Sequence, residues 1–400
     1  MSNIAIIGGG ASGMFAAIAA AQSGVNTVTI YERGSRIGRK ILATGNGRCN
    51  MTNINATVEN YHGEDPEFVR YATENFWVSE TLDMFSRMGI LYKCEDEGKV
   101  YPYSDQASSV LDALRHELDR RGVIVKCNFD VQSLKKNGNG FLITPYKGEA
   151  AYADKVIAAT GGKAAPDLGS NGGGYTLLKS FGHHITDLRP SLVQLKTSGE
   201  LTKKLKGIKV NASVSLGGFT EYDEVLFTDY GLSGPAVFSL SSRYDAQKSI
   251  TLDIMSEYSF PEIVDMLSER RAILGDTPLE EFFTGMLNKR VGQVILKSVT
   301  GSPLSRKSET LTDAEIRAVA SMIKKWRFEI VGTMSWNSAQ VTKGGARTSE
   351  FNPQTMESRL ARGLYATGEV LDIDGDCGGY NLQWAWSSGY IAGKNCAEVK

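Results

Sequence analysis

The sequence contains few of the residues that build disulfide frameworks and metal centres. It has five cysteines and four histidines in 400 residues. The cysteines are scattered, odd in number and never spaced as Cys-x-x-Cys. This pattern argues against a disulfide scaffold and against a structural zinc site, so we expect no metal. Free cysteines are typical of a reducing compartment, which predicts a cytoplasmic protein.

The chain also lacks a strong excess of one charge and any long apolar run. Its formal net charge is −1, so no overall field attracts nucleic acid or an anionic membrane. Basic clusters at 203–206 and 324–327 are interpreted as solvated faces. No segment approaches the ~20 apolar residues of a membrane span. No basic segment precedes the first apolar run, so residues 3–7 are interpreted as a strand and not as part of a signal peptide.

What the chain does contain is a dinucleotide-binding pattern at its start. The apolar run at 3–7 is followed by the glycine-rich stretch G-G-G-A-S-G at 8–13. A small-residue helix is expected over 14–23, and a second strand over 28–31 that ends at Glu32. This is the G-x-G-x-x-G fingerprint in its strand–turn–helix context, with an acid after the second strand. The sequence therefore predicts a Rossmann-type nucleotide-binding unit.

Each residue of the fingerprint has a physical role. Gly8 makes the tight turn, Gly10 lets the backbone approach a pyrophosphate, and Gly13 lets the helix pack on the strand. The free N–H groups at the start of the helix attract phosphates. Glu32 is placed to accept hydrogen bonds from an adenosine ribose.

The pattern of apolar residues changes twice along the chain. Residues 191–258 alternate apolar and polar side chains, which predicts antiparallel strands with one wet face. Residues 259–326 are helical in pattern, and capping-box spacing marks possible helix starts at Ser259, Thr277 and Thr312. A strand over 363–369 and a helix over 382–397 then restore the parallel-sheet pattern of the first part.

The predicted fold class is therefore α/β, with a nucleotide-binding domain that is discontinuous in sequence. Its first segment is 1–190 and its second is 336–400. An inserted antiparallel, barrel-like β domain is expected over 191–258 and 327–335, and a small helical domain over 259–326.

Two nucleotides are compatible with the fingerprint: diffusible NAD(H) and permanently held FAD. The strand over 363–369 favours FAD, because a late strand ending in an acid can pass beside the ribityl chain, where Glu369 would bond a hydroxyl. The helix after Gly379 would then point its N-terminus at the flavin ring. The N–H groups of residues 381–383 would stabilise negative charge at N1 and O2 of reduced flavin.

A polar loop at 38–53 is the second strong signal. A loop this long inside a compact domain is usually functional or disordered. Arg39 and Lys40 come soon after Glu32, so they can reach the pyrophosphate as cations. Arg48 to Asn50 would lie nearer the ring. A basic surface loop is the alternative interpretation.

These motifs resemble those of the BaiN-like flavoproteins, a family that includes aminoacetone-oxidase-like enzymes and is described as NAD(P)/FAD-dependent oxidoreductases. The resemblance extends over essentially the whole chain and implies an FAD domain, an inserted barrel-like domain and a small helical domain. It rests on residues 6–13, 38–53, 159–162, 226–235 and 368–385. Ala346, Gln194 and Cys377 depart from the family pattern and leave the substrate open. The expected cofactor-binding residues are Gly8, Gly10, Ala11, Ser12, Gly13, Glu32, Arg33, Arg39, Lys40, Thr44, Gly45, Arg48, Cys49, Asn50, Val131, Thr160, Gly161, Gly368, Glu369, Gly379, Asn381, Leu382 and Gln383.

The sequence contains few candidate catalytic side chains. This is no objection to an enzyme, because a flavin carries out the reaction itself and needs little more than an oriented substrate. Cys49 is a candidate redox thiol whose pKa Arg48 could lower, with packing as the alternative. Tyr380 could protonate or orient a substrate, or serve as an aromatic lid. His183 and His184 are interpreted as a helix cap.

The expected function is that of an FAD-dependent oxidoreductase acting on a small organic molecule, by amine oxidation or by enone reduction. Flavin N5 would relay the hydride or electrons. A second fingerprint for NAD(P)H is not apparent, so either a nicotinamide docks transiently or the substrate itself reduces the flavin. The alternatives are a flavin-containing RNA-binding or RNA-modifying protein and a simple NAD dehydrogenase. The sequence gives no indication of the oligomeric state.

Overall fold

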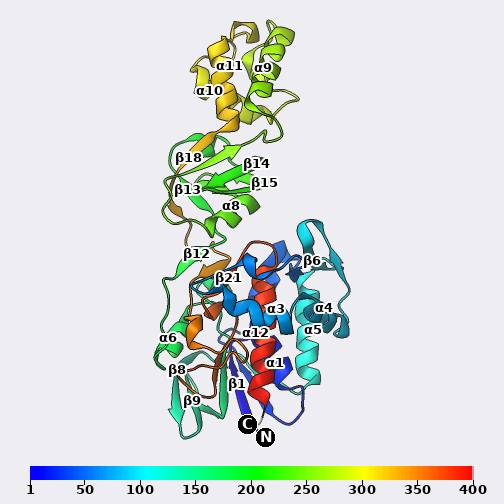
Figure 1. Ribbon diagram of the computed structural model, residues 1–400, viewed down its shortest axis with the longest axis vertical. Coiled ribbons are helices and arrows are strands. Elements are labelled where there is room, and N and C mark those ends of the chain that lie inside the picture. The colour runs from blue at the N-terminus through cyan, green and yellow to red at the C-terminus, as the bar shows by residue number, and fades with distance from the viewer. Residues whose placement is uncertain (399–400) are drawn as a thin grey trace. The chain divides into compact units, whose positions relative to one another are not determined.

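The computed structural model describes residues 1–398 (Figure 1). Contacts divide the chain into two units, one of residues 1–191 with 336–400 and one of residues 192–335. The mixed α/β fold that the sequence predicts is confirmed. In the described part of the chain, no helix has both the length and the apolar character that crossing a bilayer requires.

The first unit is built on a five-stranded parallel sheet in the order β20-β11-β1-β2-β7. The central strand β1 is almost wholly apolar and buried, as expected for a parallel strand covered on both faces. The edge strand β7 is exposed along its length. The bounds are β1 Asn3–Ile7, β2 Thr27–Tyr31, β7 Ile124–Lys126, β11 Lys155–Ala158 and β20 Leu364–Ala366.

Two helices from opposite ends of the chain pack together on this sheet. Helix α1 (Ala11–Ala20) follows β1 directly, and α12 (Tyr380–Ala397) closes the unit. Figure 1 shows the two side by side, in blue and red. Gly389 and Gly393 of α12 lie directly on the backbone of α1, where a Cβ would collide. The small residues in both helices therefore permit a close approach.

Shorter elements complete the first unit around this core. The helices are α2 Arg39–Ala43, α3 Arg70–Asn75, α4 Val78–Arg87, α5 Ala107–Arg120 and α6 Gly173–Lys179. The strands are β3 Thr52–Asn53, β4 Tyr61–His62, β5 Tyr92–Cys94, β6 Lys99–Pro102, β8 Val131–Asn137, β9 Gly140–Pro145, β10 Ala151–Ala153, β12 Arg189–Ser191, β19 Val341–Lys343 and β21 Asp374–Gly375.

The second unit contains a closed antiparallel barrel in the order β13-β16-β15-β14-β17-β18. Its apolar interior is continuous with the core of three helices, α9 to α11. The barrel strands are β13 Leu195–Thr197, β14 Lys209–Leu216, β15 Phe219–Phe227, β16 Gly231–Ser233, β17 Ser249–Asp253 and β18 Trp326–Thr333. The helices are α7 Leu201–Lys204, α8 Pro235–Ser241, α9 Phe260–Leu274, α10 Lys289–Thr300 and α11 Asp313–Lys324.

Four predicted elements differ from the structure. The first helix begins at Ala11, three residues before the expected start, because the fingerprint glycines already form its cap. The loop at 38–53 contains the short helix α2. The strand predicted over 363–369 is limited to β20 and is followed by a 3-10 turn. The capping box expected at Thr277 does not form, since backbone hydrogen bonds to residues 304–308 hold that segment.

Candidate cofactor site

The fingerprint turn has the geometry that its sequence predicts. Gly8 has φ +108°, and a Cβ there would lie within 3.0 Å of the Ala159 carbonyl oxygen. A Cβ on Gly13 would collide with the Gly8 carbonyl oxygen. The space over Gly10 is open, with no atom within 4 Å of its Cβ position. Gly8 and Gly13 are therefore needed for packing, whereas Gly10 leaves room for a ligand.

Glu32 lies next to this turn and braces it. Its Oε2 accepts a hydrogen bond from the Gly9 N–H at 2.8 Å, and its Oε1 accepts one from Gly34 at 2.6 Å. The carboxylate thus joins the phosphate-binding turn to the segment after β2. Its remaining lone pairs are positioned beside the turn, where an adenosine ribose would lie.

The packing of α12 on α1 sets the length of the site. Gly389 lies on Ser12 and Gly393 lies on Ala16, so the two helices run in the same direction. The part of α12 before Gly389 is longer than the part of α1 before Ser12. The N-terminus of α12 therefore extends about eight residues beyond the N-terminus of α1. At 1.5 Å per residue this offset is roughly 12 Å.

Both helices begin with backbone N–H groups that no side chain caps. Their N-caps are Gly10 and Gly379, and neither start has a side-chain cap. Ser259 and Thr312 cap α9 and α11 with their own hydroxyl groups, whereas α5, α6 and α8 also begin without a side-chain cap. Two uncapped helix starts, offset along one direction, form two positive ends that suit a long ligand with two electron-rich centres.

Glu369 lies between the two helix starts. Its Oε2 forms an ion pair with Lys40 at 2.8 Å, and its Oε1 accepts a hydrogen bond from the Thr342 N–H at 2.9 Å. The preceding Gly368 is so close to Ser12 that a Cβ would lie within 3.0 Å of the Ser12 hydroxyl. Gly161 lies nearby, with its Cβ position 3.9 Å from Glu369 Oε2. The predicted acid is therefore beside the line that joins α1 to α12.

One buried polar atom near this line, Oδ1 of Asn50, has no hydrogen-bond partner among the described residues and lies 2.8 Å from the Cβ position of Gly379. The hydroxyl of Tyr175 is also buried; burial and nearby Glu369 raise its pKa, and a hydrogen bond with Thr342 opposes this effect. Buried polar atoms are normally satisfied, and a bound polar ligand would supply the missing partner of Asn50. The residues present therefore fit FAD, for which α1 would hold the pyrophosphate and the start of α12 would face the ring.

Several cations that the sequence places near the cofactor are engaged by the protein. Arg39 donates to the Asp167 carbonyl at 2.6 Å. Arg33 donates to the Gly169 carbonyl at 3.1 Å. Arg48 pairs with Glu95 at 3.0 Å and lies over the Tyr101 ring. Lys40 pairs with Glu369, which follows the glycine that lies on Ser12 at the start of α1.

Other predicted cofactor residues have mainly structural surroundings. The buried side chain of Gln383 accepts from the Thr52 hydroxyl and donates to that of Thr81. The Asn381 side chain bonds the backbone of Gly375. Ala11 is the first residue of α1, Leu382 is half-buried in α12, Thr44 donates to the Ile41 carbonyl, Gly45 turns at φ +56°, Thr160 packs against α6, and Val131 opens β8.

The surroundings of Cys49 do not support a redox thiol. Its side chain is fully buried, and burial raises its pKa to about 12, although a hydrogen bond with Thr44 opposes this effect. A thiol with such a pKa is almost entirely protonated at neutral pH and is a poor nucleophile. The packing interpretation of Cys49 is therefore the better one.

Tyr380 and the histidine pair have clear structural contacts. The Tyr380 ring meets Tyr61 edge-on, with centroids 6.5 Å apart, at the first residue of α12. His183 is buried, bonds Glu350 at 2.9 Å and Ser358 at 2.9 Å, and stacks on Phe351. His183 therefore holds the structure together and does not face the cofactor segments.

The sequence interpretation missed Asp374, a buried acid in β21, as well as Tyr175 and Thr342. Asp374 stands in the run L-D-I-D-G-D, where three acids alternate with apolar or small residues. This unusual density of acids beside a buried strand was the available signal.

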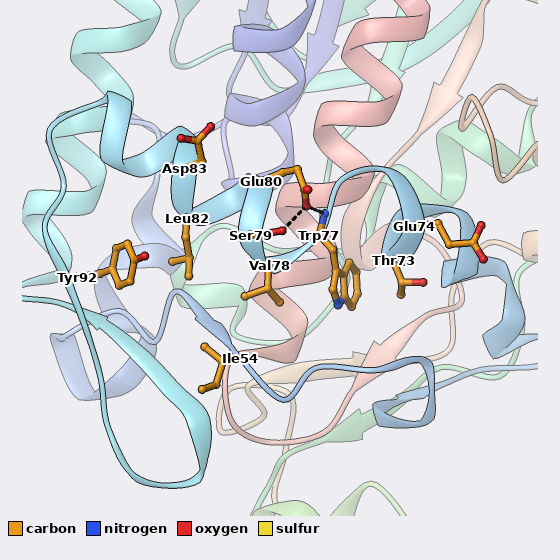
Figure 2. A pocket seen from close by; sticks show the side chains of 10 residues that line it. All are labelled: Ile54, Thr73, Glu74, Trp77, Val78, Ser79, Glu80, Leu82, Asp83 and Tyr92. Carbon is orange, nitrogen blue, oxygen red and sulfur yellow. Dashed lines mark hydrogen bonds between the residues drawn. The ribbon is translucent and has the colours of Figure 1, made fainter.

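A cavity of about 590 Å³ lies over α3 and α4 (Figure 2). Its lining includes none of the predicted cofactor residues. Glu80 at its edge accepts a hydrogen bond from the Trp77 N–H and thereby caps α4. The lining residues are Ile54, Thr73, Glu74, Trp77, Val78, Ser79, Glu80, Leu82, Asp83 and Tyr92.

Comparison with known proteins gives matches over the whole chain. The family model described as HI0933-like protein Rossmann domain matches residues 2–395. The chain is 41% identical to a 3-dehydro-bile acid delta(4,6)-reductase of Clostridium scindens, with 100% of both chains covered. It is 31% identical to a ribosomal RNA dihydrouridine synthase of Escherichia coli K12, with 99% of this chain and 98% of the relative covered.

Among solved structures, the chain resembles the 3-ketosteroid-delta4-(5alpha)-dehydrogenase of Rhodococcus jostii RHA1. The TM-score is 0.50 at 16% identity, and the match covers 100% of this chain and 97% of that chain. At this identity the similarity shows a shared fold.

Proposed function

This chain belongs to the HI0933-like Rossmann-domain family and is an FAD-dependent oxidoreductase; we propose that it adds hydrogen across a carbon–carbon double bond conjugated to a carbonyl group in a small organic molecule. The observation that carries the proposal is the 41% identity to a reductase named for the 4,6 double bonds of a 3-dehydro bile acid. A carbonyl conjugated to such double bonds makes their far carbon electron-poor, so it accepts hydride.

The site can support this chemistry with few side chains. Bound FAD supplies the hydride at N5. The chain's own contribution is binding and charge stabilisation. The uncapped N-terminus of α12 would place positive partial charge beside the negative charge of a reduced flavin bound there. Lys40 and Glu369 hold the segment between the two helix starts.

Reduction is favoured over amine oxidation, the other activity that the sequence leaves open. The C. scindens relative is named a reductase, and the E. coli relative is named for forming dihydrouridine, which carries two hydrogens more than uridine. Both named activities add hydrogen to an unsaturated carbon system. A transient reduced nicotinamide is the proposed electron source, because we find one dinucleotide fingerprint in the sequence and FAD would occupy it.

A ribosomal RNA substrate is the second candidate, and the E. coli relative favours it. A uracil ring is also an unsaturated carbonyl compound, so the same flavin chemistry would apply. RNA binding depends largely on cations that contact phosphates. The free cations of the second unit therefore bear on the choice between the two substrates.

Three of the six cations in the basic clusters of the second unit, 203–206 and 324–327, form ion pairs with acids. Lys203 pairs with Glu200 at 2.8 Å, and Lys206 pairs with Asp229 at 2.7 Å. Lys324 pairs with Asp253 at 2.6 Å. Internal pairing of this kind leaves less charge for phosphates, and this supports the small molecule over RNA.

The test is an anaerobic assay of purified FAD-loaded protein with NADH or NADPH. One arm contains a steroid with a 4,6-dien-3-one group, whose ultraviolet absorbance disappears on reduction. The other arm contains ribosomal RNA from cells that lack the gene, analysed for dihydrouridine by mass spectrometry. Loss of dienone absorbance with unchanged RNA supports the proposal. Dihydrouridine formation without dienone reduction overturns it in favour of the second candidate, and flavin bleaching with no product in either arm overturns both.

A further inference from the structure

Asp374 is a buried acid close to the start of α12. It lies in β21, in the short segment between Glu369 and the start of α12. Its residue exposure is 1%, and neither carboxylate oxygen has a hydrogen-bond donor among the described residues. An isolated buried carboxylate is costly, so a group in this position tends to hold a proton.

The charges around Asp374 place it near the balance between its two forms. Burial raises the pKa of Asp374 to about 7, while His62 and Lys343 lower it and Asp372 and Asp376 raise it. His62 faces it from β4, Lys343 from β19, and the two acids from its own segment. A small change in the local charge therefore changes its protonation near neutral pH.

A chain of polar groups connects Asp374 to solvent. Strand β21 pairs with β4 so that Asp374 lies directly opposite His62. Side chains in such cross-strand pairs are about 5 Å apart at Cβ. His62 Nε2 lies 2.7 Å from Oδ1 of Asp376, whose side chain is 28% exposed. His62 therefore stands between an exposed acid and the buried acid, hydrogen-bonded to the first and opposite the second.

The same strand is fastened to the helix start that faces the flavin. The N–H of Gly375, which follows Asp374, donates to Oδ1 of Asn381 at 2.8 Å. The Cβ position of Gly375 lies 2.9 Å from Cβ of Tyr380. Asp374 therefore directly precedes a residue that contacts the first turn of α12. Negative charge gained at that turn will be felt by the carboxyl group through a medium of low dielectric.

We propose that Asp374, linked to solvent through His62 and Asp376, takes up a proton when the bound flavin is reduced and releases it when the flavin is reoxidised. A hydride from reduced nicotinamide brings two electrons and one proton, which leaves one extra negative charge on the flavin. The proton on Asp374 compensates that charge. When the hydride leaves for the far carbon of the conjugated substrate, the near carbon takes a proton and Asp374 returns its own. The net reaction consumes one reduced nicotinamide, one proton and one double bond.

The inference rests on FAD lying at α12 but not on the identity of the substrate. The experiment is therefore a redox titration of the FAD-loaded protein with dithionite and mediators, at several pH values around 7, without substrate. For a two-electron couple, each proton taken up contributes 29.6 mV per pH unit. We expect a slope of about 59 mV per pH unit near pH 7 for the natural protein and about 30 mV for Asp374→Asn. Asp83→Asn, a surface acid of α4, is the matched control and should keep the natural slope.

Two results would overturn the inference. The first is a slope of about 30 mV per pH unit across this range for the natural protein; this measurement needs no variant. The other is an Asp374→Asn protein with the natural slope. His62→Gln adds a kinetic readout, since it should slow proton uptake on reduction, measured with a pH indicator by stopped flow. Unchanged uptake in that variant would exclude His62 from the path. None of these results depends on whether the dienone is reduced.

Discussion

Gly389 of α12 lies on Ser12 of α1 so closely that a Cβ at residue 389 would come within 3.0 Å of the Ser12 carbonyl oxygen. One turn further along, Gly393 has the same relationship to Ala16. These contacts fix the position of α12 along α1. They also determine how far the start of α12 lies from the fingerprint turn, and hence the length of the cofactor site.

Gly389→Ala should destabilise the first unit. The added methyl group has no free space, because its nearest neighbours are backbone atoms of Ser12. Overpacking of this kind costs about 1–3 kcal/mol. Urea unfolding of the apoprotein should show a lower midpoint than that of the natural protein. An unchanged midpoint would mean that the two helices are not in this close contact.

Gly10→Ala should have the opposite profile. Its Cβ meets no protein atom, so the stability of the apoprotein should change by less than about 1 kcal/mol. The methyl group would occupy the space over the turn that the pyrophosphate needs. FAD affinity should therefore fall at least about tenfold, equivalent to ~1.4 kcal/mol, measured by fluorescence titration of the apoprotein. Normal FAD binding by this variant would contradict the placement of the pyrophosphate.

Glu32→Ala should affect both properties. It removes the acceptor of two backbone hydrogen bonds, from Gly9 and Gly34, each worth about 1.5–3 kcal/mol when the acceptor is charged. The apoprotein should unfold at lower urea concentration, and FAD should bind more weakly. Glu32→Gln keeps one acceptor oxygen and should lie between the two. An unfolding midpoint of Glu32→Ala equal to that of the natural protein would show that the carboxylate does not brace the turn.

Thiol labelling tests the role assigned to Cys49. With a pKa of about 12, only about one Cys49 side chain in ten thousand is a thiolate at pH 8. A maleimide or an aromatic disulfide should therefore label exposed Cys94 long before Cys49. Cys94→Ser should remove the fastest phase, and Cys49→Ser should retain the activity. Rapid labelling of Cys49 in the folded protein would restore it as a candidate redox thiol.

The buried His183 should make the protein less stable in mild acid. Burial lowers its pKa below the usual 6.5, although the hydrogen bond to Glu350 opposes this effect. Below pH 6.5 the unfolded chain therefore binds a proton that the folded chain does not. The free energy of unfolding should fall as the pH drops from about 6.5 towards the lowered value. His183→Gln should flatten this part of the profile, whereas His116→Gln, an exposed position on α5, should not.

The features that the sequence predicted are those set by local chemistry. The roles of Gly8, Gly10 and Gly13 follow from a turn of six residues, and the caps at Ser259 and Thr312 follow from contacts three residues apart. The family resemblance to BaiN-like flavoproteins is confirmed by the family match over 2–395 and by the C. scindens relative.

The features that the sequence did not predict depend on partners far along the chain. In the sequence, Arg48 has no acid near it, but the fold brings Glu95 and Asp105 within ion-pair distance. Thr277 carries capping-box spacing, but its segment is hydrogen-bonded to residues nearly thirty positions away and forms only a 3-10 turn over Leu279–Glu281. The burial of Asp374 requires β4 and β19 to close around it. No local pattern contains this information.

The most direct measurement of the central claim is a crystal structure of the FAD-loaded protein. The account predicts an extended cofactor with its pyrophosphate over Gly10 and its flavin ring at the first turn of α12, beside Asn50 and Glu369. A cofactor folded back on α1 would contradict this placement. So would a flavin ring more than about 10 Å from residues 379–382, because charges interact little beyond that distance.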